Sequence, residues 1–211
     1  MCGRFTLGFQ PEELAKIFQA EQISEPAPAS YNIAPTDDAN IISNPEGNVI
    51  CSKMSWGFDL KGSGKIFNGR LETLQEKWRF KESAKSMRCI VPATGWYEWT
   101  KAKDGGKDPH YFSPTTDDVL ALGGLYEKTE EGQKFTIITR PATEKLRHIH
   151  NRMPLVLPEK TWSMWLNPNQ ENFVGSDLIR ESTNEFDFTI RMVSRKVNNS
   201  RSEGSELISP I

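Results

Sequence analysis

The sequence predicts an α+β domain, because it combines many short β-rich runs with a few helical ones. The runs NVICSKMSW (48–56), MRCIVP (87–92) and KFTIIT (134–139) are bounded by Gly, Pro or charged residues, as strands usually are. A chain of 211 residues is long enough for one large domain with a substantial core. No internal repeat, low-complexity tract or clear linker divides it, so we expect a single domain over residues 1–211.

The individual elements follow from residue spacing. PEELAKIFQA (11–20) begins with Pro11 at a typical first helical position and places its apolar residues on one face, which predicts a helix. PEKTWSMWLN (158–167) repeats this arrangement. FDFTIRMV (186–193) alternates apolar and polar residues and therefore predicts a strand. No glycine-rich phosphate loop follows a strand and opens a helix, which disfavours a nucleotide-binding fold.

Composition restricts the possible function and location. The net charge is −2 and the pI is near 6.0, so the chain as a whole has no electrostatic footprint for nucleic acid. A local basic patch remains possible in KWRFKESAKSMR (77–88), although such a run can equally be a solvated face. No signal peptide or membrane span is evident, and the three cysteines are scattered without a CxxC pair. We therefore expect a cytoplasmic protein with reduced thiols and no membrane partner.

The opening MCGRF (1–5) places a cysteine directly behind the initiator methionine. If Met1 is removed, the thiol of Cys2 lies beside a free α-amine. The alternative is a small residue at a frayed terminus.

Two internal residues are further candidates. Asn32 in YNIAP (31–35) precedes a proline and is expected in a turn, where its amide can bond a neighbour. Glu98 lies in GWYEW (95–99), where strand alternation puts it on the same face as Trp96. A carboxylate beside an indole is desolvated, which raises its pKa and suits acid–base chemistry. The alternative is an edge-strand glutamate in water.

The segment RHIHNRMP (147–154) holds His148 and His150. A zinc site would need further His or Cys ligands, and no second cluster supplies them, so one histidine acting as acid or base is the better hypothesis. Arginines beside flexible residues suit phosphate contacts, and they occur as Arg70 in FNGRLET and Arg195 in VSRKVNNS.

The motifs MCGRF, YNIAP, MSWGF, FNGRLET, IVPATGWYEW, FTIITR, IHNRMPLVL and VSRKVNN…ELI occur in a specific order over nearly the whole chain. In this set the sequence resembles the SOS-response-associated peptidase (SRAP) family, whose members are also called abasic-site processing proteins. The resemblance implies a β-barrel-like core of mostly antiparallel strands surrounded by helices.

The resemblance also implies an activity. Family members lose Met1 and use the N-terminal cysteine to trap the aldehyde of an abasic site in single-stranded DNA as a thiazolidine crosslink. By matching motifs, it implies that the catalytic residues are Cys2, Asn32, Glu98 and His150, and that the DNA backbone is held by Arg4, Arg70 and Arg152. No metal or cofactor is implied, and we expect a monomer that associates with the nucleoid when bound to DNA.

The chemistry of an N-terminal cysteine agrees with this activity. An α-amine has a pKa of about 7.7–8.0 whereas lysine has about 10.4, so roughly a few hundred times more of it is neutral at pH 7. The amine can form a Schiff base with the sugar aldehyde, and the adjacent thiol can then close a five-membered ring intramolecularly. Gly3 has no Cβ, which lets the sugar approach the terminus.

Two other functions remain open at this point. The chain could be a peptidase or amidase with an N-terminal cysteine nucleophile, for which removal of Met1 is one cleavage, or a non-catalytic single-strand-binding module. The sequence also departs from the family in WGFDLKGSGKIFNGR (56–70), which lacks a Pro- and Trp-containing loop and has NGR in place of NAR. Because of this departure, it is open whether the protein prefers DNA at a strand junction to plain single-stranded DNA.

Overall fold

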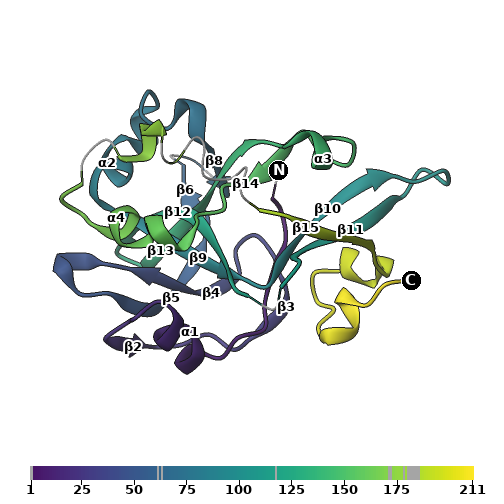
Figure 1. Cartoon of the computed structure of the whole chain (residues 1–211), viewed down its shortest axis with the longest axis horizontal. Helices are drawn as coiled ribbons and strands as arrows, with labels where there is room; N and C mark the ends of the chain where they lie inside the picture. Colours follow the sequence, from purple (N-terminus) through teal and green to yellow (C-terminus); the bar gives the residue numbers. More distant parts are fainter. Residues whose placement is uncertain are drawn as a thin grey trace.

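A closed barrel of five strands forms the centre of the structure (Figure 1). The computed structural model describes residues 2–60, 62, 64–116, 118–170, 173–177, 179 and 186–211. Neighbouring barrel strands are antiparallel and follow the order β13 (Gly132–Pro141), β12 (Leu120–Thr129), β9 (Arg88–Ala93), β4 (Asp38–Ser43) and β5 (Ile50–Trp56). A short parallel pairing of β5 with β13, through Lys134↔Ser55 and Phe135↔Trp56, closes the ring.

The barrel interior explains why these sequence runs form strands. All six residues of β9 are buried, and a strand enclosed on both sides reads as a continuous apolar run. Inside, the rings of Trp56 and Phe135 stack with centroids 6.0 Å apart, and Phe5 meets Trp56 edge-on at 5.2 Å. Phe5 belongs to β1 (Phe5–Leu7), so the start of the chain is packed into the core.

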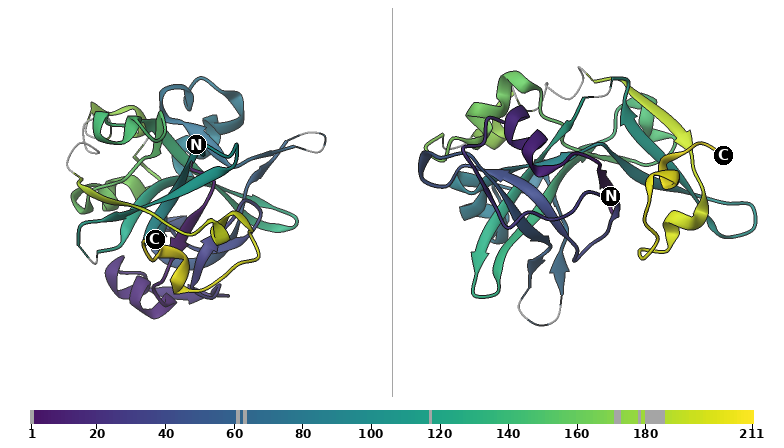
Figure 2. Two further views of the ribbon diagram at one scale, coloured as in Figure 1. Left: turned by 90° about the vertical axis from the view of Figure 1, so that its right-hand side faces the viewer. Right: turned by 90° about the horizontal axis from the view of Figure 1, so that it is seen from below.

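A second sheet contains β1, the first strand of the chain. Its strand order is β15 (Phe188–Met192), β11 (Lys107–Pro114), β10 (Gly95–Lys101), β1 and β3 (Ser30–Ile33). The hairpin of β10 and β11 projects from the barrel, and the C-terminal segment lies beside it (Figures 1 and 2). That segment covers one face of the sheet through a small cluster of Tyr97, Tyr111, Val193, Val197 and Leu207.

The remaining elements cover the edges and ends of the barrel. The other strands are β2 (Gln22–Ser24), which pairs with β5; β14 (Arg152–Pro154) and β8 (Asn68–Arg70), which pair with β13; and the hairpin of β6 (Phe58–Asp59) and β7 (Lys65–Ile66). The helices are α1 (Pro11–Ile17), α2 (Trp78–Ser86), α3 (Glu144–Arg147) and α4 (Trp162–Leu166). Short 3₁₀ turns include η2 (Leu71–Thr73), η3 (Glu159–Thr161), η6 (Arg195–Asn198) and η7 (Ser205–Ile208).

The predicted class, an α+β fold with a barrel-like core of mostly antiparallel strands, is confirmed. The helix predicted at 11–20 spans Pro11–Ile17, with Pro11 at its first position and a capping box between Gln10 and Glu13. The run 158–167 opens with the 3₁₀ turn η3 and becomes helical only at Trp162. Helix α2 was not predicted, although Phe80 and Ala84 are buried four residues apart. No helix among the described residues is long and apolar enough to cross a bilayer.

Candidate functional site

Cys2 is held in the protein core. Its side chain is 0% exposed, and its carbonyl oxygen accepts a hydrogen bond of 2.9 Å from Nδ2 of Asn68 on β8. The chain then joins β10, where the backbone N–H of Tyr97 donates to the carbonyl of Arg4 at 3.0 Å. The frayed-terminus interpretation of Cys2 is therefore wrong. Asn68 was missed because its partner is a main-chain carbonyl, which leaves no side-chain pattern in the sequence.

Glu98 is buried on the barrel side of β10. The predicted alternation is confirmed, since Trp96 packs in the main core while Tyr97 and Trp99 pack against the C-terminal segment. Glu98 is only 3% exposed, so the alternative of an edge-strand glutamate in water is wrong. Burial raises the pKa of Glu98 to about 7, because desolvation disfavours the carboxylate. This carboxyl group can therefore exchange protons near neutral pH.

His150 lies beside Glu98. Its Nε2 atom is 3.9 Å from Oε2 of Glu98. Its Nδ1 atom accepts a hydrogen bond of 3.0 Å from the backbone N–H of Arg152 and also lies 3.2 Å from the carbonyl oxygen of the same residue. Burial lowers the pKa of His150, so at pH 7 the ring is mainly neutral, and its Nε2 atom faces the carboxyl group of Glu98.

The thiol of Cys2 belongs to the same electrostatic neighbourhood. Burial raises the pKa of Cys2, and the negative charge of Glu98 raises it further. The thiol is therefore protonated at neutral pH. The structure brings Cys2, Glu98 and His150 together, from the start of the chain, β10 and the segment before β14.

Asn32 occupies a different position from the one predicted. It lies in strand β3 rather than in a turn, and it is 2% exposed. Its Oδ1 accepts a hydrogen bond of 2.6 Å from Nη1 of Arg4, and its Nδ2 donates to the carbonyls of Asn199 and Ser202. Arg4 Nη1 also donates to the carbonyl of Val197 at 2.9 Å. Asn32 and Arg4 together attach the C-terminal segment to the second sheet.

Arg70 and Arg152 come close to each other at the end of β13. Arg70 is exposed and stands opposite Thr139 in the β8–β13 register. Arg152 donates to the carbonyl of Thr139 at 2.7 Å and forms a bidentate pair with Glu72, at 2.8 and 3.0 Å. Arg152 is thus already partly neutralised by Glu72, whereas Arg70 is open to solvent.

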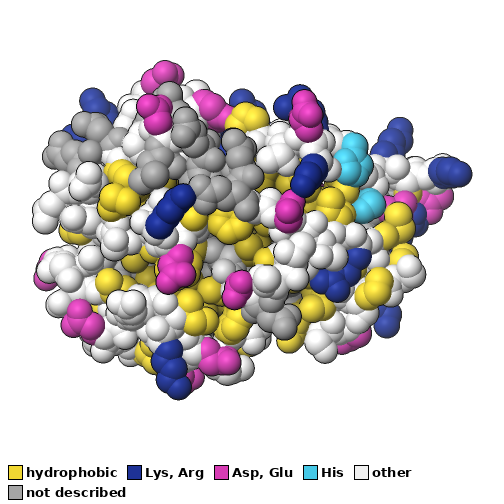
Figure 3. Space-filling model, viewed as in Figure 1, with side chains coloured by type: hydrophobic (Ala, Val, Ile, Leu, Met, Phe, Trp, Pro, Cys, Tyr) yellow, Lys and Arg dark blue, Asp and Glu magenta, His cyan; other side chains and the backbone are white. Residues whose placement is uncertain are grey.

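A pocket of about 550 Å³ lies directly beside the acid–base pair. It is lined by Glu98, Trp99, Thr100, Lys101, Gly105, Gly106, Lys107 and His150. Figure 3 shows histidine side chains at the surface on the side where β10 and β11 leave the barrel. The two lysines were not singled out from the sequence, although the turn residues of TKAKDGGKDP are a hairpin signal.

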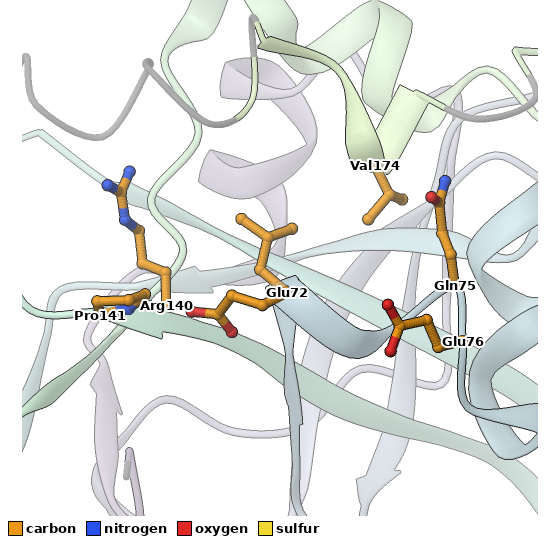
Figure 4. A pocket seen from close by; sticks show the side chains of 7 residues that line it. Glu72, Gln75, Glu76, Arg140, Pro141 and Val174 are labelled. Atoms are coloured by element: carbon orange, nitrogen blue, oxygen red, sulfur yellow. The ribbon is translucent and has the colours of Figure 1, made fainter.

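A second pocket, of about 330 Å³, is lined in part by Glu72, the partner of Arg152, and Figure 4 shows the side chains around it. Glu72 and Glu76 line it together with Gln75 and Arg140. Two carboxylates beside one guanidinium make this pocket unsuitable for a phosphate group.

Much of the basic segment 77–88 is not a binding surface. Arg88 is 2% exposed and donates to the carbonyls of Trp165 and Ala84, and Arg79 pairs with Glu127 at 2.7 Å. These guanidinium groups cap backbone carbonyls or pair with acids inside the fold. Lys77, Trp78 and Lys81 are left at the surface, with Trp78 74% exposed.

Arg195 was expected to contact phosphate, but in the structure two acids hold it. It donates to Asp104 at 2.6 Å and to Asp108 at 2.7 Å. In the part of the chain that the structure describes, no three His, Cys, Asp or Glu side chains gather as potential metal ligands, and Cys2, Cys51 and Cys89 are all free thiols.

Comparisons with known proteins find matches over most of the chain. The family model described as SOS response associated peptidase (SRAP) matches residues 1–200. Abasic site processing protein YoqW of Bacillus subtilis is 34% identical over 99% of both chains, and YobE of the same organism is 37% identical over 80% of this chain and 83% of its own. A crystal structure of a protein from Bacteroides thetaiotaomicron covers 100% of both chains with a TM-score of 0.80 at 18% identity, which shows the same fold.

Proposed function

The chain belongs to the SOS response associated peptidase (SRAP) family, and on that premise we propose that it processes abasic sites in single-stranded DNA. The reaction that fits the site best is covalent capture: Cys2, made N-terminal by removal of Met1, forms a thiazolidine with the ring-opened abasic sugar. The observation that carries this proposal is the burial of Cys2 within reach of the charge of Glu98, which lies beside His150.

The protonation state of the thiol favours an amine-first order. Because burial holds the pKa of Cys2 above its usual range, little thiolate is available for a first attack. The α-amine is neutral in a substantial fraction near pH 7. Its attack on the aldehyde carbon and loss of one water give the Schiff base; addition of the thiol across C=N then closes the ring, and the thiol proton passes to nitrogen.

Glu98 and His150 manage the protons of these steps. With a pKa of about 7, Glu98 can accept a proton from the ammonium group and return one to the departing water. His150 faces Glu98 through Nε2, so it can donate a proton to the sugar ring oxygen during opening and take it back during reversal. The other proposed residues hold the substrate. Arg4, Arg70 and Arg152 bind the DNA backbone, and Asn32 positions Arg4 by accepting its hydrogen bond.

Neither alternative is favoured by a specific observation. A peptidase with a cysteine nucleophile needs a thiolate, whereas burial raises the pKa of Cys2. A non-catalytic strand-binding module depends on phosphate neutralisation, and the net charge of the chain is −2. Removal of Met1 is the one peptide cleavage that the proposal requires.

One assay separates the three functions. The processed protein is incubated with single-stranded DNA carrying one abasic site, and separately with the same strand without the lesion, before a denaturing gel. A slower band that depends on the lesion supports covalent capture. Peptide turnover without that band would support a peptidase, and reversible DNA binding without either product would support a binding module.

A further inference from the structure

The pocket beside Glu98 and His150 continues to the tip of the β10–β11 hairpin. Strand β1 pairs with only the start of β10, at Phe5↔Trp96 and Thr6↔Gly95. Beyond that point the hairpin projects from the barrel (Figures 1 and 2). A ligand that occupies the acid–base site therefore lies next to the hairpin tip.

Two lysines face each other at this tip. Lys101 and Lys107 are directly paired in the register of β10 and β11, are exposed, and both line the pocket. Like charges directly opposite on two strands destabilise a hairpin. Among the residues that the structure describes, neither lysine forms an ion pair, so no ion pair within that part of the chain offsets this repulsion.

The acids of the hairpin are engaged elsewhere. Asp104 and Asp108 both hold Arg195, at 2.6 and 2.7 Å. Glu98 is the acid among the described residues that line the pocket, and its charge is reduced at neutral pH. The lysine pair thus leaves the pocket with uncompensated positive charge, which an anion would neutralise.

Two glycines keep the tip of the hairpin free of side chains beside the pocket. Gly105 and Gly106 carry no side chain into the pocket, and a Cβ at Gly105 would meet no atom within 4 Å. Gly105 also has φ +84°, a conformation that this turn requires and that other residues rarely adopt. The backbone of the tip therefore leaves the pocket open along the strand.

We propose that Lys101 and Lys107 together bind one backbone phosphate of the DNA strand, next to the nucleotide that lies at Glu98 and His150. This inference rests on the proposed function, because it identifies the phosphate group as the anion. Phosphate contacts fix the register of a strand without reading its bases. The lysine pair would thus position the lesion for capture in any sequence context.

The first test uses reversible binding. The substrate is a single-stranded oligonucleotide with a tetrahydrofuran abasic analogue, which has no aldehyde and cannot be crosslinked. The Lys101→Ala/Lys107→Ala variant is compared with Lys103→Ala, which removes a charge from the same hairpin outside the pocket. The double variant should flatten the log–log salt dependence of binding by about 0.7 per lost phosphate contact, and Lys103→Ala should leave it unchanged.

The second test changes the DNA and is read in both the wild-type protein and the double variant. A neutral methylphosphonate is placed at single linkages on either side of the lesion. One linkage should weaken binding of the wild-type protein but cause no further loss in the double variant. Equal effects in both proteins at every linkage, or equal salt slopes for the double variant and Lys103→Ala, would overturn the proposal. Neither outcome affects lesion-dependent crosslinking by the wild-type protein, which tests the proposed function. Failure of the lysine proposal can therefore be told apart from failure of the proposed function.

Discussion

His150 and Glu98 are neighbours, with Nε2 and Oε2 3.9 Å apart, although they come from different sheets. Glu98 lies on β10 of the second sheet, and His150 precedes β14, which pairs with β13 of the barrel. The contact therefore depends on the docking of the two sheets. Burial favours the neutral form of both groups, since it raises the pKa of Glu98 and lowers that of His150, and this prepares them to pass protons near pH 7.

Glu98→Gln should slow the first step of crosslinking by about 10²–10⁴, the usual contribution of a general acid–base group. The loss should shrink as the pH rises from 6 to 9, because more of the amine is then neutral without help. Rapid-mixing measurements of crosslink formation across this range test it. Glu159→Gln changes an exposed glutamate that does not line the pocket beside the acid–base pair, and it serves as the control. Wild-type kinetics in Glu98→Gln would remove this residue from the mechanism.

His150→Ala should slow both formation and release of the crosslink, while the final crosslinked fraction changes less. The reason is that the imidazole of His150 assists opening of the sugar ring during crosslinking and closure of the same ring during release. A group that assists both directions changes the two rates more than the final balance between them. The matched control is His148→Ala, because His148 lies in the same segment but is exposed and is not part of the pocket lining. A slower forward rate with an unchanged release rate would contradict a role in both directions.

Glu98 should also make stability depend on pH. Its pKa in the folded protein is about 7, above its ordinary value of 4.5. The stability that it contributes is therefore fully present below pH 4.5 and is lost as the pH rises through 7. The change amounts to about 3 kcal/mol at most, from about 1.4 kcal/mol per unit.

Denaturant unfolding of the wild type and Glu98→Gln at pH 5 and pH 8 measures this effect. Glutamine stays neutral, so the variant should gain stability relative to the wild type as the pH rises. A difference between the two proteins that is constant over this range would show that Glu98 titrates in the same way in the folded and unfolded chain.

Glu72 should restrain the contact of Arg152 with DNA. Since the two side chains form a bidentate pair, Glu72→Gln should release the guanidinium group and tighten binding to single-stranded DNA. Arg152→Ala should weaken binding and lower the salt slope by about 0.7. Glu76→Gln removes one negative charge from the pocket that Glu72 also lines. It therefore measures how much DNA binding tightens when the protein simply loses a negative charge. An unchanged slope in Arg152→Ala would mean that this arginine supports β13 rather than DNA.

Local patterns predicted strands such as β5, β9, β13 and β15. They also predicted the face on which Glu98 lies, because strand alternation has a fixed period of two. Strands β4 and β11 were not predicted. Closure of the barrel was not predictable from local patterns, because β5 and β13 pair across about 80 residues at Lys134↔Ser55. The β-barrel expectation came from the family resemblance instead.

The candidate site was predictable where motifs carry titratable groups, as at Cys2 and His150. It was not predictable where a side chain bonds the backbone far away in sequence. Asn32 was expected in a turn because it stands ahead of Pro35. Its partners in the structure, the carbonyls of Asn199 and Ser202, leave no local pattern. The same holds for Asn68, whose side chain donates to the carbonyl of Cys2.

The intact mass of the crosslinked product tests the central claim most directly. The protein without Met1 is incubated with an oligonucleotide that carries one abasic site, and Cys2→Ala is treated in parallel. A thiazolidine requires a wild-type product whose mass is the sum of the two reactants minus one water, stable to denaturation, and no stable product from Cys2→Ala, which can form only a reversible imine. A stable adduct of Cys2→Ala with the same oligonucleotide, or no adduct of the wild type, would contradict the account.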